Sequence, residues 1–301
     1  MSGATEALSR TIAGARDLKS VVRSMKALAA SSIGQYEKAV EALGGYYRTV
    51  ELGLSACLKA APATSAPARR SSSAGPIGAV IFGSDQGLVG RFNDLLLEFA
   101  LGQLGALPGD VRRVWAVGER MHAMTSDAAL PAPALLPVPN SVDTIAPLVG
   151  RILIAIEAAR ERDDIREIYV FHNRPKAAAV YEPVCQRLLP LDAAWQEGIA
   201  VLSWPTKALP QVIEGTAPAL GDFIREYFFI LLFQACAESL AGENASRLAA
   251  MQRAEKNIDR ILAELNRSFH RIRQESIDEE LFEVISGYES LGADRHRPQT
   301  S

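Results

Sequence analysis

Glycines separate a short apolar run from a helical pattern in the stretch VIFGSDQGLVGRFND, residues 80–94. A glycine-rich turn at such a place lets backbone N–H groups approach a phosphate, as in the dinucleotide fingerprint G-x-G-x-x-G. The glycines here are Gly83, Gly87 and Gly90, and Asp85 occupies the position of the second fingerprint glycine. Because a carboxylate at that point would repel a diphosphate, we do not expect the loop to hold a nucleotide.

Three other kinds of site also lack part of their pattern. A P-loop needs a lysine and a hydroxyl residue after its last glycine, but Arg91 and Phe92 stand there. A hydrolase could draw on Ser84 and His172, yet Phe82 replaces the first glycine of the G-x-S-x-G elbow. Metal sites need closely spaced ligands, whereas the remaining candidates are scattered: His122, His270, His296, Cys57, Cys185 and Cys236. The sequence therefore predicts no catalytic residue, cofactor site or metal site.

The composition is that of a soluble protein with a substantial core. Of the 301 residues, 48% are hydrophobic and 22% are charged, and the formal net charge is −3. This balance gives no basic field that would recruit nucleic acid or an anionic membrane. The most apolar stretch, residues 227–237, is too short to span a bilayer. The N-terminus has no signal-like segment, and the odd number of scattered cysteines indicates a reducing compartment.

Apolar residues repeat at a spacing of seven near both ends of the chain. One line consists of Leu8, Ala15, Val22, Ala29, Tyr36, Leu43, Val50 and Cys57. A second line is broken by Lys19 and Lys26, where Leu18 and Met25 are expected to take over. The C-terminal third has a similar line through Leu248, Met251, Ile258, Leu262, Leu265, Phe269, Ile272 and Ile277. Such seams are typical of coiled coils. Ordinary bundle helices are the alternative, but these average only three or four turns.

Short strand-like runs alternate with helical patterns between these two regions. The runs lie at residues 77–82, 112–117 and 166–172, and two further strands are expected at residues 181–191 and 199–204. This alternation predicts a parallel sheet with right-handed crossovers. Both long helices join the same central segment, so they should pair antiparallel. The apolar surface of residues 223–240, present on almost every side, indicates that the second helix is covered there.

The predicted fold is therefore a long antiparallel coiled coil of N- and C-terminal helices with a central Rossmann-like α/β domain. The expected segments are a coiled-coil helix at residues 1–60, a flexible linker at 61–76, the α/β domain at 77–205, a second coiled-coil helix at 206–291 and a polar tail at 292–301.

Three segments match, in the same order along the chain, the sequence motifs of one protein family. SDQGLVGRFN, residues 84–93, is similar to that family's loop S-D-R-G-L-C-G-G-F-N. SVVRSMKALAASSIGQYEKA, residues 20–39, is similar to its N-terminal helix motif I-T-K-A-M-K-M-V-A-A-S. Residues 243–287 resemble its C-terminal signature, which contains A-R-M-x-A-M and N-K-A-R-Q-x-x-I-T-x-E-L-x-E-I-V-x-G, and CQRLLPL, residues 185–191, matches a family strand. The chain therefore resembles the gamma subunit of rotary F-type ATP synthases, and the resemblance extends over nearly the whole chain.

The chain also departs from the family pattern. Gln86, Val89 and Arg91 replace the arginine, the cysteine and the second glycine of the loop, and Asp278 stands where threonine is common. Residues 292–301 extend past the usual end. These differences suggest a divergent branch, and they leave open whether the chain serves a housekeeping synthase or an alternative, sodium-linked one.

The resemblance implies a central rotor shaft that couples ion flow through a membrane c-ring to ATP synthesis or hydrolysis at alpha/beta sites, without catalysis of its own. The implied partners are the alpha and beta subunits, the epsilon subunit and the c-ring. The implied location is the cytoplasmic side of a bacterial inner membrane, reached only through the complex. The coupling ion and the net direction of the reaction stay open.

The resemblance also implies which residues contact the alpha/beta ring: Met25, Lys26, Ser84, Asp85, Gln86, Arg273, Gln274, Asp278, Leu281 and Phe282. Met25 and Lys26 match positions that face a beta-subunit loop, and Arg273, Gln274 and Asp278 match the C-terminal partners of that contact. Leu281 and Phe282, with Val284 and Ile285, would form an apolar tip inside the ring. For each residue the alternative is plain coiled-coil packing or a solvated face.

Two other functions fit the architecture. A Rossmann-like nucleotide-binding enzyme with helical oligomerisation arms predicts nucleotide binding by the isolated chain, and the broken glycine spacing argues against it. A coiled-coil scaffold or chaperone predicts binding of diverse client proteins. Neither explains three family motifs in the right order.

Overall fold

The computed structural model describes residues 2–60, 75–131, 134–176, 179–208, 210–211 and 215–294. Most of the predicted linker, residues 61–74, and the end of the predicted tail, residues 295–301, lie outside the described residues. The chain divides into two compact units: a smaller one of Met1–Ala27 with Met251–Ser301, and a larger one of Leu28–Ala250.

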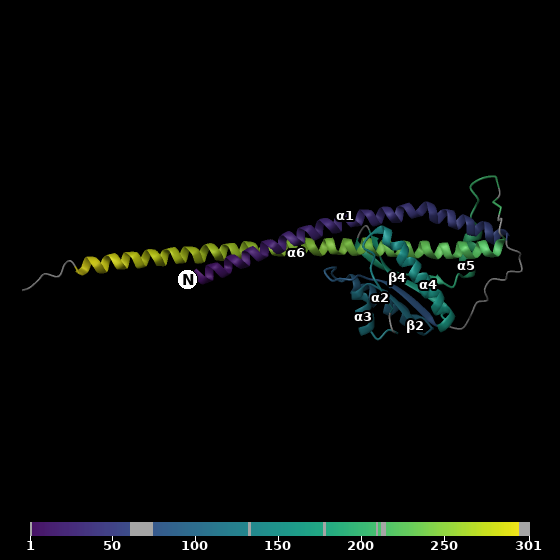
Figure 1. Cartoon of the computed structure of the whole chain (residues 1–301), viewed down its shortest axis with the longest axis horizontal. Coiled ribbons are helices and arrows are strands. Elements are labelled where there is room, and N and C mark those ends of the chain that lie inside the picture. Colours follow the sequence, from purple (N-terminus) through teal and green to yellow (C-terminus); the bar gives the residue numbers. More distant parts are fainter. Residues whose placement is uncertain are drawn as a thin grey trace, which may run out of the picture. The chain divides into compact units, whose positions relative to one another are not determined.

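Two long helices, the first and last elements of the chain, each contribute to both units (Figure 1). α1 spans Ser2–Ala60 and contains no proline, so its i→i−4 hydrogen bonds are uninterrupted. α6 spans Thr216–Asp294. It begins at Thr216 rather than at residue 206 as expected, because Pro205 and Pro210 interrupt the chain before it. It also continues to Asp294, past the expected end at residue 291.

The predicted seam of α1 packs against α6 in the larger unit. Ala29, Tyr36, Val50 and Cys57 are buried there, and Leu43 is half-buried. The ring centroids of Tyr47 on α1 and Tyr227 on α6 are 5.8 Å apart. A spacing of seven therefore identifies the buried stripe of α1 correctly.

The two helices run antiparallel in the smaller unit. Lys19 forms an ion pair with Asp259, and the Nζ atom of Lys26 lies 2.6 Å from the Oε2 atom of Glu255. Higher residue numbers on α1 thus meet lower numbers on α6, which confirms the predicted direction.

One detail of the predicted seam is wrong. Leu18 was expected to replace Lys19 in the seam, but Leu18 is 54% exposed. The side chain of Lys19 is only 22% exposed and reaches Asp259. A lysine can cover apolar surface with its methylene stem while its ammonium group meets a carboxylate or water, so the charged residue keeps the inward position.

A mixed sheet lies at the centre of the larger unit, with the strand order β3-β2-β1-β4-β5. The strands are β1 Ile77–Phe82, β2 Val111–Val117, β3 Ala134–Leu136, β4 Glu167–Lys176 and β5 Ala179–Leu189. Neighbours among β1 to β4 are parallel, as predicted, and β5 is antiparallel to β4. The connecting helices are α2 Phe92–Ala106, α3 Glu119–Asp127 and α4 Ile145–Asp163, the last preceded by the 3-10 helix η1 Val142–Thr144.

The expected strand at residues 199–204 is wrong. The helix α5, Ala193–Ala200, covers its first residues, and residues 201–204 lie outside helices and strands. Asp192 starts this helix because its Oδ1 atom accepts the backbone N–H of Trp195 at 2.9 Å. The polar N-cap therefore favours a helix that continues to residue 200, into the first two residues of the expected strand.

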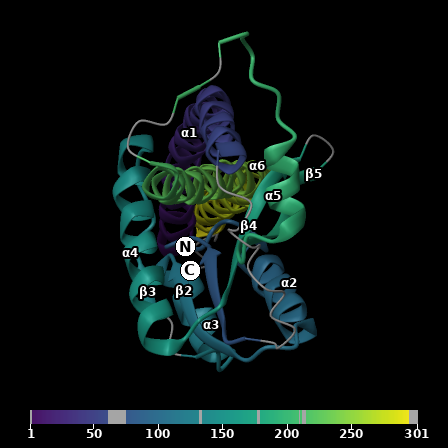
Figure 2. The ribbon, with the colours of Figure 1, turned by 90° about the vertical axis from the view of Figure 1, so that its right-hand side faces the viewer.

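Apolar side chains cover both faces of the sheet. On one face, Val80 and Val170 pack in a cluster with the buried residues of α4 and with residues 227–241 of α6. On the other face, Ile81 and Phe171 pack with α2. Figure 2 shows α4 and α2 on opposite sides of the sheet. Strand residues alternate between the two faces, as pleating requires. The predicted covering of residues 223–240 is confirmed, since the most enclosed of them are at most 1% exposed: Ile230, Leu232, Ala235, Cys236 and Ala237.

Candidate functional site: the glycine loop and the long helices

Hydrogen bonds within the chain close the glycine loop, residues 83–91, around Ser84. The backbone N–H of Ser84 donates to the Oδ1 atom of Asn93 at 3.0 Å. The Ser84 hydroxyl donates to the carbonyl of Gln86 at 2.9 Å and accepts from the Nδ2 atom of Asn93 at 2.8 Å. Ser84 is 0% exposed. The N–H group and the hydroxyl that a phosphate would use are thus occupied by Asn93 of α2 and by the carbonyl of Gln86.

Asp85 lies at the start of α3. Its Oδ1 atom accepts the backbone N–H of Glu119, the first residue of that helix, at 3.1 Å. A carboxylate in this position offsets the positive end of the helix. Gly118, just before the helix, has a φ of +103°, and a Cβ atom there would lie 2.4 Å from the carbonyl oxygen of Ser84. The aspartate thus has a structural partner within the chain.

Replacing Asp85 with alanine should lower the free energy of unfolding by about 1 kcal/mol, the usual cost of losing a helix cap. Urea denaturation followed by circular dichroism measures this effect. Asp94→Ala is the matched control, because Asp94 is exposed in the first turn of a neighbouring helix and makes no side-chain hydrogen bond among the described residues. An equal decrease in the free energy of unfolding of both variants would show that Asp85 does not act as a cap of α3.

The tip of the loop presents Gln86, Gly87 and Leu88 to the outside. Leu88 is 62% exposed and has a φ of +64°, a conformation that leucine rarely adopts. Val89 then turns inward, at 1% exposed, and its carbonyl accepts the hydroxyl of Ser246 on α6. The loop is therefore a braced turn that displays an apolar side chain. Sequence reasoning did not single out Leu88, and its only signal is a leucine placed between two glycines.

Ser84 and His172, the two residues that a hydrolase could use, form their hydrogen bonds with other partners. His172 places its Nε2 atom 2.9 Å from the Oε2 atom of Glu238 on α6, whereas the Ser84 hydroxyl bonds within its own loop. The part of the chain that the structure describes contains no group of three or more His, Cys, Asp or Glu side chains that could hold a metal ion. Among the same residues, no helix has the length and apolar character needed to cross a membrane.

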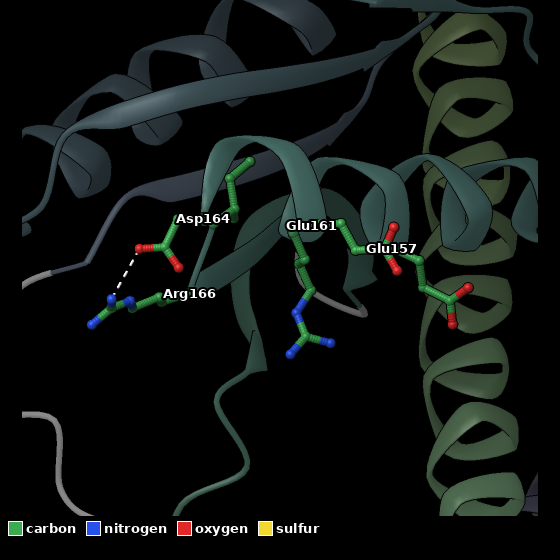
Figure 3. Close-up of a pocket in the computed structure, with 6 residues that line it drawn as sticks. Glu157, Glu161, Asp164 and Arg166 are labelled. Atoms are coloured by element: carbon green, nitrogen blue, oxygen red, sulfur yellow. Dashed lines mark hydrogen bonds and ion pairs between the residues drawn. The ribbon is translucent and has the colours of Figure 1, made fainter.

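An open pocket of about 650 Å³ lies at the C-terminal end of α4 (Figure 3). Its lining is mostly charged: Glu157, Arg160, Glu161, Asp164, Ile165 and Arg166. Asp164 and Arg166 form an ion pair at 2.9 Å. The pocket lies just before β4, at the amino end of that strand, whereas ligands of open α/β sheets bind beyond the carboxyl ends. Its position therefore does not favour a nucleotide.

Met25 and Lys26 lie in the smaller unit, on the side of α1 that meets α6. Met25 packs on the cluster formed by Val22, Met251 and Ile258. The Lys26 ammonium pairs with Glu255, and the lysine side chain remains 35% exposed. Part of each side chain thus holds the two helices together, and the rest is open to a partner.

The other predicted contact residues lie further along α6 and are exposed. Arg273, Gln274 and Asp278 are exposed, and Leu281 and Phe282 are 57% and 70% exposed. The numbers of Arg273 and Glu255, which is the partner of Lys26, differ by 18. At 1.5 Å per residue this is a separation of about 27 Å along the helix. The structure therefore does not bring the two sets of predicted contact residues together.

Glu255 accepts hydrogen bonds from two cationic side chains of α1, Arg23 and Lys26, and these bonds make the stability of the smaller unit depend on pH. Hydrogen bonds from Arg23 and Lys26 lower the pKa of Glu255 to about 2. A carboxylate whose pKa is lowered by folding stabilises the folded state above its unfolded pKa, near 4.5 here, and this stability is lost as the pH falls toward 2.

Glu255→Gln should therefore weaken protection against hydrogen exchange in residues 19–26 and 251–262 at pH 6, and the difference from wild type should vanish near pH 2. Protection factors corrected for the intrinsic exchange rate measure this. Glu264→Gln, at an exposed position of α6, is the control that should show no such difference. A difference in protection factors between wild type and Glu255→Gln that stays constant with pH would contradict the lowered pKa of Glu255.

Comparison with known proteins gives a consistent result. The family model described as ATP synthase matches residues 4–291. The ATP synthase gamma chain of Syntrophus aciditrophicus (strain SB) is 26% identical over 301 residues, covering 94% of this chain and 97% of the relative. The ATP synthase gamma chain of Polynucleobacter asymbioticus is 24% identical over 289 residues, covering 94% and 98%.

Solved structures share the fold. A chain in the cryo-EM structure of Euglena gracilis mitochondrial ATP synthase, OSCP/F1/c-ring, aligns with a TM-score of 0.70 at 15% identity and covers 100% of this chain and 99% of its own length. A chain in the rotor of the same synthase aligns with a TM-score of 0.62 at 12% identity, covering 92% and 100%. Because the family match extends from residue 4 to residue 291 of 301, the chain belongs to the ATP synthase family, among its gamma chains.

Proposed function

We propose that this chain is the central shaft of the rotor in an F-type ATP synthase, where it couples ion flow to ATP synthesis or hydrolysis. The observation that carries this proposal is the family match over residues 4–291, together with gamma-chain relatives that align over almost their whole length. The chain itself is not catalytic in this proposal: its partners hold the nucleotide sites, and its own glycine loop is filled by Ser84 and Asn93.

A pair of antiparallel helices has the physical properties that a shaft needs. The two helices have different side chains, so the pair presents a different surface in every direction. Rotation of such a pair inside a ring of three alpha–beta pairs would give each pair a different contact at any instant. Binding energy at the nucleotide sites and the angle of the shaft are then linked, as any two coupled equilibria must be.

The proposed contacts with the alpha/beta ring are exposed residues of the smaller unit and the tip of the glycine loop. On α6 they are Arg273, Gln274 and Asp278, followed by the apolar tip of Leu281, Phe282, Val284 and Ile285, each of which is at least 45% exposed. Met25 and Lys26 contribute the parts of their side chains that α6 leaves open. At the loop, Gln86 and Leu88 would make the contact, because Ser84 is enclosed and Asp85 holds α3.

The remaining partners follow from the same proposal. The epsilon subunit and the c-ring would bind the α/β domain, residues 77–205, and the adjoining ends of the coiled-coil helices. The chain would reach the cytoplasmic face of a bacterial inner membrane as a peripheral part of the complex. The structural neighbours support this picture, since they come from an assembly of OSCP, F1 and c-ring and from a rotor.

Gln274→Leu is expected to lower the ATPase activity of the assembled complex several-fold without unfolding the chain. Gln274 is exposed on α6, so its replacement removes polar contacts only with a partner, and surface substitutions change stability by about 0.5 kcal/mol or less. Gln103→Leu, an exposed glutamine on α2, serves as the matched control. Unchanged ATPase activity in the Gln274→Leu complex would show that Gln274 does not take part in the contact with the alpha/beta ring.

The proposal is tested by mixing the purified chain with the alpha and beta subunits of its own organism. Size-exclusion chromatography with mass determination should show one copy of the chain for every three alpha–beta pairs, with altered ATPase activity. A chain that stays separate and binds nucleotide alone would favour the Rossmann-like enzyme instead.

A further inference from the structure

Four polar side chains meet inside the larger unit, where α6 lies against β4. Glu238 of α6 is 7% exposed and stands at the centre. Its Oε2 atom accepts from the Nε2 atom of His172 at 2.9 Å and from the Nε atom of Arg174 at 3.0 Å. Its Oε1 atom accepts from the Nε2 atom of Gln234 at 2.7 Å. We call these four residues the β4–α6 joint.

Glu238 is ionised in this arrangement and depends on its donors. Burial raises the pKa of Glu238, but the hydrogen bonds from His172 and Gln234 and the nearby Arg174 outweigh it, and the pKa falls to about 2. The Nδ1 atom of His172 is buried and has no hydrogen-bond partner in the described part of the chain. Because the ionised Glu238 carboxylate can only accept, the hydrogen between the two residues is assigned to Nε2 of His172. His172 and Arg174 both come from β4, so a single strand supplies two of the three donors.

Further directional contacts surround the joint. The hydroxyl of Ser239 donates to the carbonyl of Phe82 in β1 at 2.9 Å. One turn later, Gly242 lies so close to β4 that a Cβ atom there would be 3.3 Å from the carbonyl oxygen of Asn173. The turn of α6 from Glu238 to Gly242 thus rests directly on β1 and β4.

The buried apolar residues of α6 around the joint include several small side chains, which hold the register of the helix less strictly than hydrogen bonds do. Ala235, Ala237 and Ala241 are each at most 1% exposed, and they offer small, smooth surfaces to their neighbours. Apolar burial is not directional, so these alanines tolerate a small rotation or shift of α6 better than a buried carboxylate does. The same shift would leave the Glu238 carboxylate buried without its donors, which is a costly arrangement. Register is also the best-attested role of buried polar groups.

We propose that the β4–α6 joint is the torque-bearing connection through which the α/β domain turns α6. This inference rests on the proposed function as a rotor shaft. Torque that enters at the α/β domain reaches α6 through the contacts of this helix with the sheet, α4 and α5, and the joint is the hydrogen-bonded part of its contact with the sheet. His172, Arg174 and Glu238 act as positioning residues that keep the helix from slipping on the sheet under load.

The test uses the complete ATP synthase, reconstituted in vesicles with wild-type or variant chain. The variant Glu238→Leu with His172→Leu replaces the buried polar pair with apolar side chains, an exchange that often leaves stability unchanged. We expect normal assembly and normal ATPase activity in leaky vesicles, where the shaft carries no load. In sealed vesicles, ATP-driven ion transport per ATP should fall by about threefold or more, within the range of single coupling contacts.

Two single variants keep the test decisive even if the double variant folds poorly. Glu238→Gln keeps a side-chain oxygen that accepts from His172, so it should retain most of the coupling. If these residues only filled space, Glu238→Gln and the double variant would show the same coupling. Arg174→Met removes one donor at a side chain that is already 45% exposed, so the chain should fold, with an intermediate loss of coupling. Full coupling in either the double variant or Arg174→Met would overturn the proposal. A wild-type chain that fails to assemble would instead refute the proposed function, before any variant is compared.

Discussion

Phe82→Ala is expected to lower the free energy of unfolding by about 3–5 kcal/mol, the range measured when a buried phenylalanine is truncated in a core. Phe82 ends β1, is 1% exposed and belongs to the cluster that joins the sheet to α6. Its loss removes apolar burial and leaves a cavity next to the contact between Ser239 and β1. Urea denaturation followed by circular dichroism measures the change.

The matched control is Val201→Ala, because Val201 is 77% exposed in the same unit. That substitution should change the free energy of unfolding by no more than about 0.5 kcal/mol. Similar losses in the two variants would show that the region around Phe82 does not form the core described above.

Leu281→Asp with Phe282→Asp is expected to abolish most coupling while leaving the isolated chain folded. The two side chains are 57% and 70% exposed near the end of α6, and a group of exposed apolar side chains commonly marks a protein contact. Two carboxylates would have to be buried unpaired in that contact, which is strongly unfavourable. ATP-driven ion transport by the reconstituted complex should fall by about tenfold.

Glu279→Gln with Glu280→Gln is the control, because both residues are exposed on the same stretch of α6 and the change adds no charge to the apolar tip. This variant should keep most of the transport. Normal assembly and transport in the Leu281→Asp, Phe282→Asp variant would show that the apolar tip does not contact a partner.

The sequence predicts the long helices well because their signal is local and repeated. A spacing of seven selects the buried positions of α1 from Val22 to Cys57 without knowledge of the partner helix. The same reasoning fails at Lys19, where the pattern treats every lysine as outward-facing although its stem can lie in the seam. It also fails at residues 199–204, whose first two residues end the helix that the Asp192 cap starts.

Polar contacts between residues far apart in the chain could not be predicted from the sequence. Lys26 and Glu255 are far apart in the chain, and a heptad pattern shows the face of each helix but not the register between them. His172 and Glu238 were not linked for the same reason. In the glycine loop, sequence similarity identified the segment, whereas the inward direction of Ser84 and the outward direction of Leu88 follow from positive φ angles and from the Asn93 bridge.

Rotation of the chain inside its complex tests the central claim most directly. A cysteine introduced at the exposed position Val201 can carry a bead or a fluorescent probe, after Cys185 has been replaced by serine. With the alpha/beta ring fixed to a surface and ATP present, the probe should turn in one direction and pause at three angles per revolution, one for each alpha–beta pair. A probe that stays still while the same complexes hydrolyse ATP would contradict the account of this chain as a rotor shaft.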